Sequence, residues 1–305
     1  MSDLLAIGEA MVELNQPSEG APFVQGFGGD TSNAMIAAAR LGADAAYFTA
    51  VGADRFGQAL TELWMREGVD ASRIVVNGGA HTGLYFVTHG ADGHTFSYMR
   101  AGSAASRIGE ADLPVDRIRE TKILHASGIS QAISSSAADA VFAAIDIARD
   151  AGRLVSYDPN LRLKLWPLRR ARAIIHEAMR FCDIALPGLD DSLALTSLND
   201  PDAIVDFYLR LGAPVVALKL GKSGVLVATA KARQRIAARA VAAIDATGAG
   251  DCFDGAFLTE YARLGDAFAA ARFANVAAGL STTGYGAVHP LPRRADVEAV
   301  MAAAK

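Results

Sequence analysis

The hydrophobic positions of this chain follow two alternating spacings. Short runs of β-branched and other apolar residues are succeeded by segments in which apolar residues recur with helical periodicity. This alternation is typical of a parallel sheet covered by helices on both faces. It predicts core strands over 4–8, 45–51, 123–126, 154–158, 184–186 and 215–220, and helices over 31–41, 57–67, 135–151, 168–181, 202–211, 249–264 and 267–281.

Two segments depart from this rhythm, Glu13 to Phe27 and Ile74 to Arg100. They contain strand-forming residues punctuated by turn sequences such as Asn77-Gly78-Gly79 and Ala91-Asp92-Gly93, without a helical segment to cover them. We expect the second segment to form a pair of hairpin strands, and both segments to build a small β-sheet that projects over the core as a lid. Residues 1–305 are thus predicted to form one α/β domain with a β lid near 13–27 and 74–100.

Composition narrows the classes of function. The chain has 305 residues, of which 51% are hydrophobic and 20% charged, and its net charge is -4. An acidic balance argues against nucleic acid or an anionic membrane as the main partner, since both require a basic face. The segment Met1 to Glu9 lacks the basic region of a signal peptide, so we expect a cytoplasmic protein. Cys182 and Cys252 have no metal-binding spacing and are interpreted as free thiols.

The most distinctive segment runs from Asp245 to Phe257. It places two glycines and the carboxylate of Asp251 at the start of an apolar helix, where free backbone N–H groups bind anions. A carboxylate repels a bound phosphate, but it suits a base that takes the proton of a hydroxyl attacking phosphorus. The segment therefore indicates phosphoryl transfer to an alcohol, with an Asp-rich turn that caps a core helix as the alternative.

Other segments add polar groups that fit a ligand site. Gly28 to Asn33 precedes a predicted helix, so its backbone can approach a ligand closely while Asp30 and Asn33 present polar groups. Aromatic hydroxyls and a guanidinium lie on the predicted lid at Tyr85, Tyr98 and Arg100, and Arg162 follows the end of a core strand, where open α/β sheets bind ligands. Two arginines can hold a carboxylate by forked hydrogen bonds, although ion pairs with neighbouring acids would explain each one separately.

Three other patterns are set aside. Gly221-Lys222-Ser223 resembles the end of a P-loop, but the first glycine of that pattern would fall at Val216, inside a predicted strand. No complete dinucleotide glycine fingerprint follows the first strand, so hydride transfer has no support. No acid or cysteine at metal-binding spacing accompanies the three histidines of the lid, His81, His89 and His94.

Taken in order, these segments resemble the ribokinase-like (PfkB) carbohydrate kinases, and more closely the 2-keto-3-deoxygluconate kinases among them. The resemblance rests on 28–33, 82–85, 98–105, 158–162 with 165–166, 219–221 and 245–257. It implies a Rossmann-like ribokinase fold with a β lid, ATP with Mg²⁺ as phosphoryl donor, a monovalent cation in some members, and a homo-oligomer formed through the lid.

The resemblance also assigns roles by position. It makes Asp251 the catalytic base and the amides of Gly248, Ala249 and Gly250 the anion hole. The residues it places in the sugar-acid site, besides Asp251, are Gly29, Asn33, Tyr85, Tyr98, Arg100 and Arg162. Those it places at ATP are Lys219, Gly221, Gly224, Gly248, Gly250, Asn275 and Gly284.

One departure from the family concerns the metal. The family commonly carries Asn-x-x-Glu after the strand that precedes its nucleotide loop, whereas this chain has Gly188 and Asp191 at those positions. Asp191 is therefore the candidate that positions Mg²⁺, through water. The expected reaction is phosphorylation of the primary hydroxyl of 2-keto-3-deoxygluconate, giving 2-keto-3-deoxy-6-phosphogluconate. The alternatives are a fructokinase or other neutral-sugar kinase, and a non-catalytic sugar and nucleotide binder.

Overall fold

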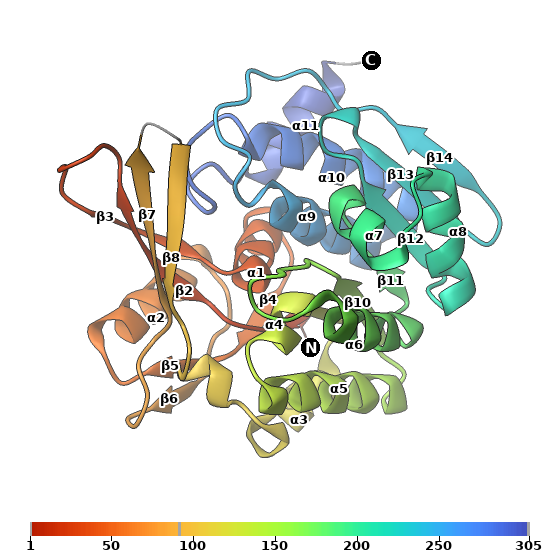
Figure 1. The fold of residues 1–305 in the computed structure, drawn as a ribbon. Coiled ribbons are helices and arrows are strands. Elements are labelled where there is room, and N and C mark those ends of the chain that lie inside the picture. The colour runs from red at the N-terminus through yellow and green to blue at the C-terminus, as the bar shows by residue number, and fades with distance from the viewer. Residues whose placement is uncertain (1, 91–92, 304–305) are drawn as a thin grey trace.

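The predicted core strands pair into one mostly parallel sheet (Figure 1). In the computed structural model, which describes residues 2–90 and 93–303, the strand order is β14-β13-β12-β11-β10-β9-β1-β4. The parallel strands are β1 (Leu4–Ile7), β4 (Ala45–Phe48), β9 (Ile123–Ser127), β10 (Leu154–Asp158), β11 (Ile184–Ala185) and β12 (Val215–Lys219). They confirm the six core strands expected from the sequence, with boundaries shifted by a few residues.

The antiparallel edge of this sheet was not predicted. After β12 the chain makes a short 3-10 turn, η3 (Gly221–Ser223), and returns as β13 (Val225–Thr229) and β14 (Arg233–Ile236). Gly224 has φ +95°, and a side chain there would lie 2.0 Å from the Ile236 carbonyl oxygen. Only glycine fits this reversal, because L side chains avoid positive φ and the backbone comes too close.

Helices cover both faces of the sheet because the strands are apolar on both sides. On β1, Leu4 and Ala6 pack into one core cluster and Leu5 and Ile7 into the other. The first cluster packs against α1 (Asp30–Arg40), α2 (Arg55–Glu67), α9 (Ala249–Leu264), α10 (Ala267–Ser281) and α11 (Arg294–Ala302). The second packs against α3 (Val115–Glu120), α5 (Ser135–Asp150), α6 (Leu168–Arg180), α7 (Leu189–Thr196) and α8 (Pro201–Leu211).

All seven helices predicted from periodicity are present, and α9 and α10 have the expected bounds. The sequence did not predict α3, α4 (Gly128–Ala132), α7 or α11, nor the 3-10 helices η1 (Ala105–Arg107) and η2 (Glu110–Asp112). These elements are too short for helical periodicity to emerge, since even a nine-residue helix spans fewer than three turns.

A smaller sheet stands beside the core next to α1 (Figure 1). Its order is β3-β2-β7-β8, from β3 (Val24–Gly28), β2 (Met11–Gln16), β7 (Leu84–Gly90) and β8 (Gly93–Met99). This sheet matches the expected lid segments, except that residues 74–77 are not part of it. Instead, β6 (Val75–Asn77) pairs with β5 (Ala50–Gly52), which also divides the strand predicted over 45–51. Of the predicted turn 91–93, Ala91 and Asp92 lie outside the described residues.

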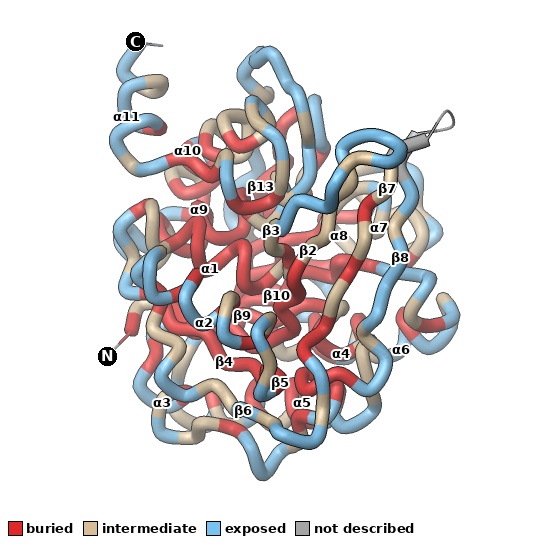
Figure 2. Tube along the Cα trace, turned by 90° about the vertical axis from the view of Figure 1, so that its left-hand side faces the viewer, coloured by how far each residue is buried: buried red, intermediate tan, exposed pale blue. Residues whose placement is uncertain are grey.

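Burial distinguishes the two sheets (Figure 2). The central strands and α1 are buried along most of their length, whereas β3 is exposed at Val24 and Gln25 and residues 95–99 of β8 are mostly exposed. In the part of the chain that the structure describes, no helix is long and apolar enough to cross a membrane.

Candidate active site

The start of α9 has the geometry of an anion site. Gly248 caps the helix at φ +76°, and the Ala249 amide donates to the Ala246 carbonyl across the turn, 3.1 Å. Asp245 holds the preceding loop by accepting from the Thr247 amide and from the Gly286 amide, both at 2.9 Å. The amides of Gly248 and Gly250 donate to no other described residue, so these two, and not Ala249, are available to an anion.

Asp251 lies in the first turn of α9 and is partly buried. Its Oδ2 accepts a 2.8 Å hydrogen bond from Asn33 Nδ2. Burial, together with the carboxylates of Asp30 and Asp158, raises the pKa of Asp251 to about 7, against the opposing effects of Asn33 and Lys219. A carboxylate of this pKa is a much stronger base than an ordinary aspartate and is still substantially ionised at neutral pH.

Two glycines bring Asn33 to Asp251. Gly29 turns the chain from β3 into α1 at φ +127°, where a side chain would lie 2.5 Å from the Glu9 carbonyl oxygen. Gly255 lets α9 approach α1, because a side chain there would lie 2.1 Å from the Ala34 carbonyl oxygen. The two helices therefore pack closely, with Asn33 against Asp251. Gly29 and Asn33 thus both contribute to the geometry around Asp251.

The lid contributes Tyr85, Tyr98 and Arg100 on one side of the candidate site. The Tyr85 hydroxyl donates to Glu13 Oε2 at 2.6 Å, and the rings of Tyr85 and Tyr98 have centroids 6.0 Å apart. The Arg100 guanidinium lies 5.8 Å from the centre of the Tyr98 ring. Burial and the Glu13 carboxylate raise the pKa of Tyr85, so its hydroxyl stays protonated and donates.

Arg100 is ion-paired with Glu9, whose side chain is fully buried. Glu9 also accepts from the Ser103 hydroxyl at 2.8 Å. The Arg100 Nε is buried and makes no hydrogen bond to any described residue. The guanidinium is therefore paired with one carboxylate, and its Nε–H is still available as a hydrogen-bond donor. Both interpretations of Arg100, a structural ion pair and a ligand contact, are supported.

Arg162 extends from the loop that follows β10. Its side chain is exposed and donates only to the neighbouring Leu161 carbonyl at 2.9 Å; among the described residues no carboxylate forms a salt bridge with it. The same loop reaches the start of α1, because Asn160 Nδ2 donates to Asp30 Oδ2 at 2.8 Å. The loop thus places Arg162 on the same side of the core as the start of α1.

The residues expected at ATP come from three connected segments. Gly221 and Gly224 frame the turn between β12 and β13, and Gly221 has no atom within 4 Å of the place a side chain would occupy. The Asn275 amide donates to the Ala237 carbonyl at 2.7 Å, and the Gly224 turn packs against residues 236–238. Gly284 follows α10, and a side chain there would begin 2.9 Å from the Pro290 side chain. Gly221 therefore leaves its backbone open to close approach by a ligand.

Lys219 differs from these backbone positions. Its Nζ donates to Asp158 Oδ2 at 3.0 Å and to both carboxylate oxygens of Asp254 at 2.8 and 3.1 Å. Asp158 and Asp254 are almost completely buried, and the lysine is partly buried. The ammonium expected at ATP is therefore held by two carboxylates next to the first turn of α9.

Asp191 lies in α7, three residues after Gly188. Its Oδ2 accepts from the Leu161 amide at 3.0 Å, and burial together with the Asp158 carboxylate raises its pKa to about 6. No group of three or more His, Cys, Asp or Glu residues that could hold a metal ion occurs among the described residues. A single carboxylate such as Asp191 is compatible with Mg²⁺, which proteins bind through one or two carboxylates plus substrate phosphates.

Several acids around Asp251 were not identified as site residues from the sequence. Asp30 was expected to present a polar group, but Asp158, Glu9, Glu13 and Asp254 were assigned no role in the site. Asp254 had a detectable signal, since a carboxylate inside an otherwise apolar helix is rarely buried without a partner. The partner, Lys219, comes from a distant strand, and no local pattern reveals such a pair.

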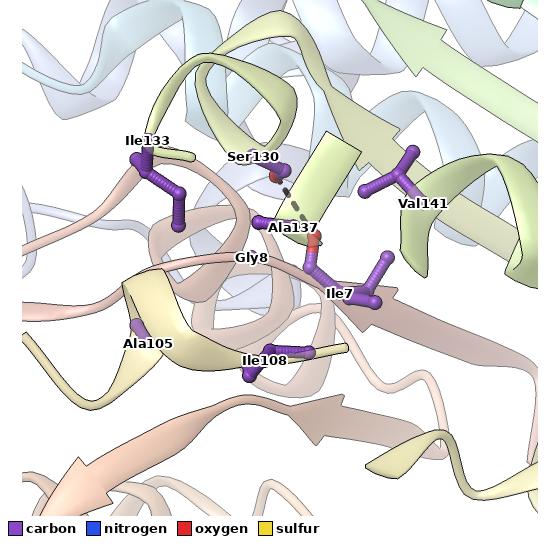
Figure 3. A pocket seen from close by; sticks show the side chains of 8 residues that line it. All are labelled: Ile7, Gly8, Ala105, Ile108, Ser130, Ile133, Ala137 and Val141. Carbon is purple, nitrogen blue, oxygen red and sulfur yellow. Dashed lines mark hydrogen bonds between the residues drawn. The ribbon is translucent and has the colours of Figure 1, made fainter. Parts of the chain in front are cut away.

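A small hollow lies on the other side of β1 (Figure 3). It is lined by Ile7, Gly8, Ala105, Ile108, Ser130, Ile133, Ala137 and Val141, and the Ser130 hydroxyl donates to the Ile7 carbonyl at 3.0 Å. None of these eight side chains is charged, so the hollow lacks the groups that phosphate or a sugar acid requires.

The chain is similar to known sugar kinases. The model of the pfkB family carbohydrate kinases matches residues 1–294. Fructokinase-1 of Oryza sativa subsp. japonica is 34% identical over 94% of this chain and 92% of that protein. The 2-dehydro-3-deoxygluconokinase of Thermoproteus tenax is also 34% identical, over 86% of this chain and 82% of that protein. A fructokinase from Vibrio cholerae O395, solved in fructose, ADP and calcium ion bound form, has a TM-score of 0.88 and 29% identity, covering 98% of each chain.

The fold and the family match agree over almost the entire chain. The central parallel sheet with its small second sheet is the ribokinase-like fold, and the family match covers the start of α9 with Asp251. Fructokinases and 2-dehydro-3-deoxygluconokinases are similar to this chain to the same degree, so the comparisons define the class of enzyme without defining the sugar. The chain belongs to the pfkB family of carbohydrate kinases.

Proposed function

We propose that this carbohydrate kinase transfers a phosphoryl group from ATP to the primary hydroxyl of a sugar acid, 2-keto-3-deoxygluconate (also called 2-dehydro-3-deoxygluconate). The observation that carries the transfer is the position of Asp251, an aspartate with a pKa near 7 beside free amides at a helix start. A non-catalytic binding protein would not need a basic carboxylate at Asp251, because a carboxylate repels bound phosphate.

In the proposed mechanism Asp251 accepts the proton of the attacking hydroxyl. Asn33 orients the carboxylate through its 2.8 Å hydrogen bond and leaves Oδ1 for the substrate. The amides of Gly248 and Gly250 stabilise the negative charge that develops on the moving phosphoryl group. Closure of the small sheet over the sugar would exclude water that otherwise hydrolyses ATP.

The nucleotide is proposed to lie along Gly221, Gly224, Asn275 and Gly284, whose segments are joined through residues 236–238 and 244. Mg²⁺ supplies charge neutralisation between the phosphates. Asp191 would hold it through water, since a single carboxylate plus phosphates suffices for this ion.

The substrate proposal rests on the two arginines. Arg162 has a guanidinium that no described carboxylate neutralises, and Arg100 keeps a buried Nε with no acceptor. A substrate carboxylate satisfies both, because ionised acceptors match guanidinium donors better than hydroxyls do. One observation favours the neutral-sugar alternative: Glu9 already balances the charge of Arg100. The fructokinase reaction therefore stays the second candidate.

Arg162→Met is expected to reduce kcat/KM for 2-keto-3-deoxygluconate by about 10- to 150-fold, the effect of losing one charged hydrogen bond. The same variant should change kcat/KM for fructose far less, since a hydroxyl makes little use of the guanidinium. Steady-state kinetics with both sugars measure the two ratios. A parallel loss for both sugars would contradict the sugar-acid proposal.

Arg100 needs a compensated variant. Removing its guanidinium alone leaves the buried Glu9 carboxylate unpaired, which destabilises the fold. Burial already raises the pKa of Glu9, so glutamine is a reasonable neutral replacement. Arg100→Met with Glu9→Gln should thus reproduce the acid-selective loss. The matched control is Arg153→Met, an arginine at the opposite end of β10 that donates to the Arg119 carbonyl.

The small sheet also offers a surface for the proposed homo-oligomer. Phe23, Val24, Tyr98 and Met99 are exposed large side chains on β3, β8 and the loop before β3, and they belong to both faces of the sheet. A second copy packing on one face of this sheet would cover part of them.

A further inference from the structure

Lys219 joins two parts of the core that must be aligned for Asp251 to work. One partner, Asp158, ends β10, and the other, Asp254, lies one turn beyond Asp251 on α9. The Lys219 Nζ lies 3.7 Å from the place where a side chain on Gly250 would begin, so the ammonium is directly beside the first turn of α9. Three hydrogen bonds to two carboxylates use the three donors that an ammonium has.

We propose that Lys219 is a positioning residue for the base, which ties α9 to the end of β10 through Asp158 and Asp254 and keeps a cation next to Asp251, instead of binding the nucleotide. The proposal rests on the proposed role of Asp251. It differs from the nucleotide role that the resemblance assigned to this lysine, because a phosphate contact would require the ammonium to leave both carboxylates buried and uncompensated.

The charges within the cluster are consistent with this role. Burial raises the pKa of Asp254, whereas Lys219 and the hydrogen bond from Asp254 lower the pKa of Asp158 in spite of its burial. The carboxylates outweigh burial and raise the pKa of Lys219. The lysine thus keeps its positive charge between two buried carboxyl groups whose pKa values are shifted in opposite directions. Lys219 acts on Asp251 in the direction that lowers its pKa.

Other titratable groups face the same cluster. They are Asp30 from α1, Asp191 from α7, Arg162 from the loop after β10 and His125 from β9. Burial lowers the pKa of His125 to about 4, and its Nδ1 lies 3.1 Å from the Ser156 hydroxyl oxygen, so this ring stays neutral around pH 7. The cation that contacts α9 within this cluster is Lys219, through Asp254.

The test measures the pKa of Asp251 directly, by the pH titration of its carboxyl carbon in protein labelled with ¹³C-aspartate. The resonance is assigned by its loss in Asp251→Asn. In Lys219→Met the pKa of Asp251 should rise by about 1–2 units, because a nearby opposite charge has been removed. Lys219→Met with Asp158→Asn removes the cation that lowers the pKa of Asp251 together with an anion that raises it, so the pKa should return close to the wild-type value. Lys122→Met, which removes an exposed lysine paired with Asp3, is the matched control and should leave it unchanged.

Nucleotide binding is measured on the same proteins by calorimetry with a non-hydrolysable ATP analogue, adenylyl imidodiphosphate, and Mg²⁺. The proposal predicts that both Lys219 variants bind it within about threefold of wild type, a difference below 1 kcal/mol. Should Lys219→Met fail to fold, Lys219→Met with Asp158→Asn still tests this prediction. An unchanged Asp251 pKa in Lys219→Met, or a tenfold or larger loss of analogue affinity in the double variant, would overturn the proposal. Neither readout depends on turnover, so its failure is distinguishable from failure of the proposed reaction.

Discussion

Asp251→Asn is expected to lower kcat by about 10²–10⁴-fold, the usual contribution of general-base catalysis. Asparagine has nearly the same shape and can still contact Asn33, but it cannot accept the proton of the attacking hydroxyl. The fold and the affinity for nucleotide should be retained. Turnover of ATP with saturating sugar, measured beside thermal unfolding, separates lost catalysis from lost structure.

The pH dependence of the wild type gives an internal check. Asp251 must be ionised to act, so kcat/KM should fall as the pH drops through its pKa of about 7 and reach a plateau above it. The residual activity of Asp251→Asn should lack this acid limb. Asp254→Asn is the matched variant, a buried carboxyl on the same helix, and its loss should be clearly smaller. A kcat within a few-fold of wild type for Asp251→Asn would mean that another group is the base.

Gly250→Val is expected to reduce kcat by about 10²–10³-fold, the magnitude associated with losing one donor to a developing oxyanion. A side chain at this position meets only the Lys219 Nζ, at 3.7 Å, and the glycine is exposed at a helix start. The protein should therefore fold normally, while the branched side chain occupies space that the phosphoryl group needs. Steady-state kinetics and the melting temperature measure the two effects.

Gly109→Val is the control for this substitution. Gly109 precedes η2 in extended backbone at φ -128°, and a side chain there would come no closer than 4.0 Å to another atom. It should fold and turn over like the wild type. If Gly250→Val also kept normal kinetics, the start of α9 would be a structural turn without a phosphate role.

The alternation of apolar runs and helical periodicity predicted most of the core, because both patterns are repeated over many residues. It could not predict β13 and β14, whose existence depends on one reversal at Gly224 that only the neighbouring strand explains. It also misplaced residues 74–77, which look like the other strands of the small sheet but pair with β5. Pairing partners of short strands are decided by tertiary contacts.

The candidate site shows the same division. Asp251, Asn33 and the glycines belong to contiguous motifs, and the structure brings Asn33 and Asp251 within hydrogen-bonding distance. Two ion-paired groups join distant segments: Arg100 with Glu9, and Lys219 with Asp158 and Asp254. The sequence therefore identified the two cations but could not show that each is already paired with a carboxylate. These pairs change the predicted roles of both cations, which is why the arginine test requires a compensated variant.

Phosphoryl transfer to a primary sugar hydroxyl is tested by identifying the product. Wild-type protein is incubated with ATP, Mg²⁺ and 2-keto-3-deoxygluconate, and the mixture is examined by ³¹P NMR. We predict a new phosphomonoester resonance that is split by the two protons of the adjacent methylene carbon, together with ADP in equal amount, and neither product with Asp251→Asn on the same time scale. If ATP were hydrolysed to inorganic phosphate and neither 2-keto-3-deoxygluconate nor fructose were phosphorylated, the protein would not be the proposed kinase.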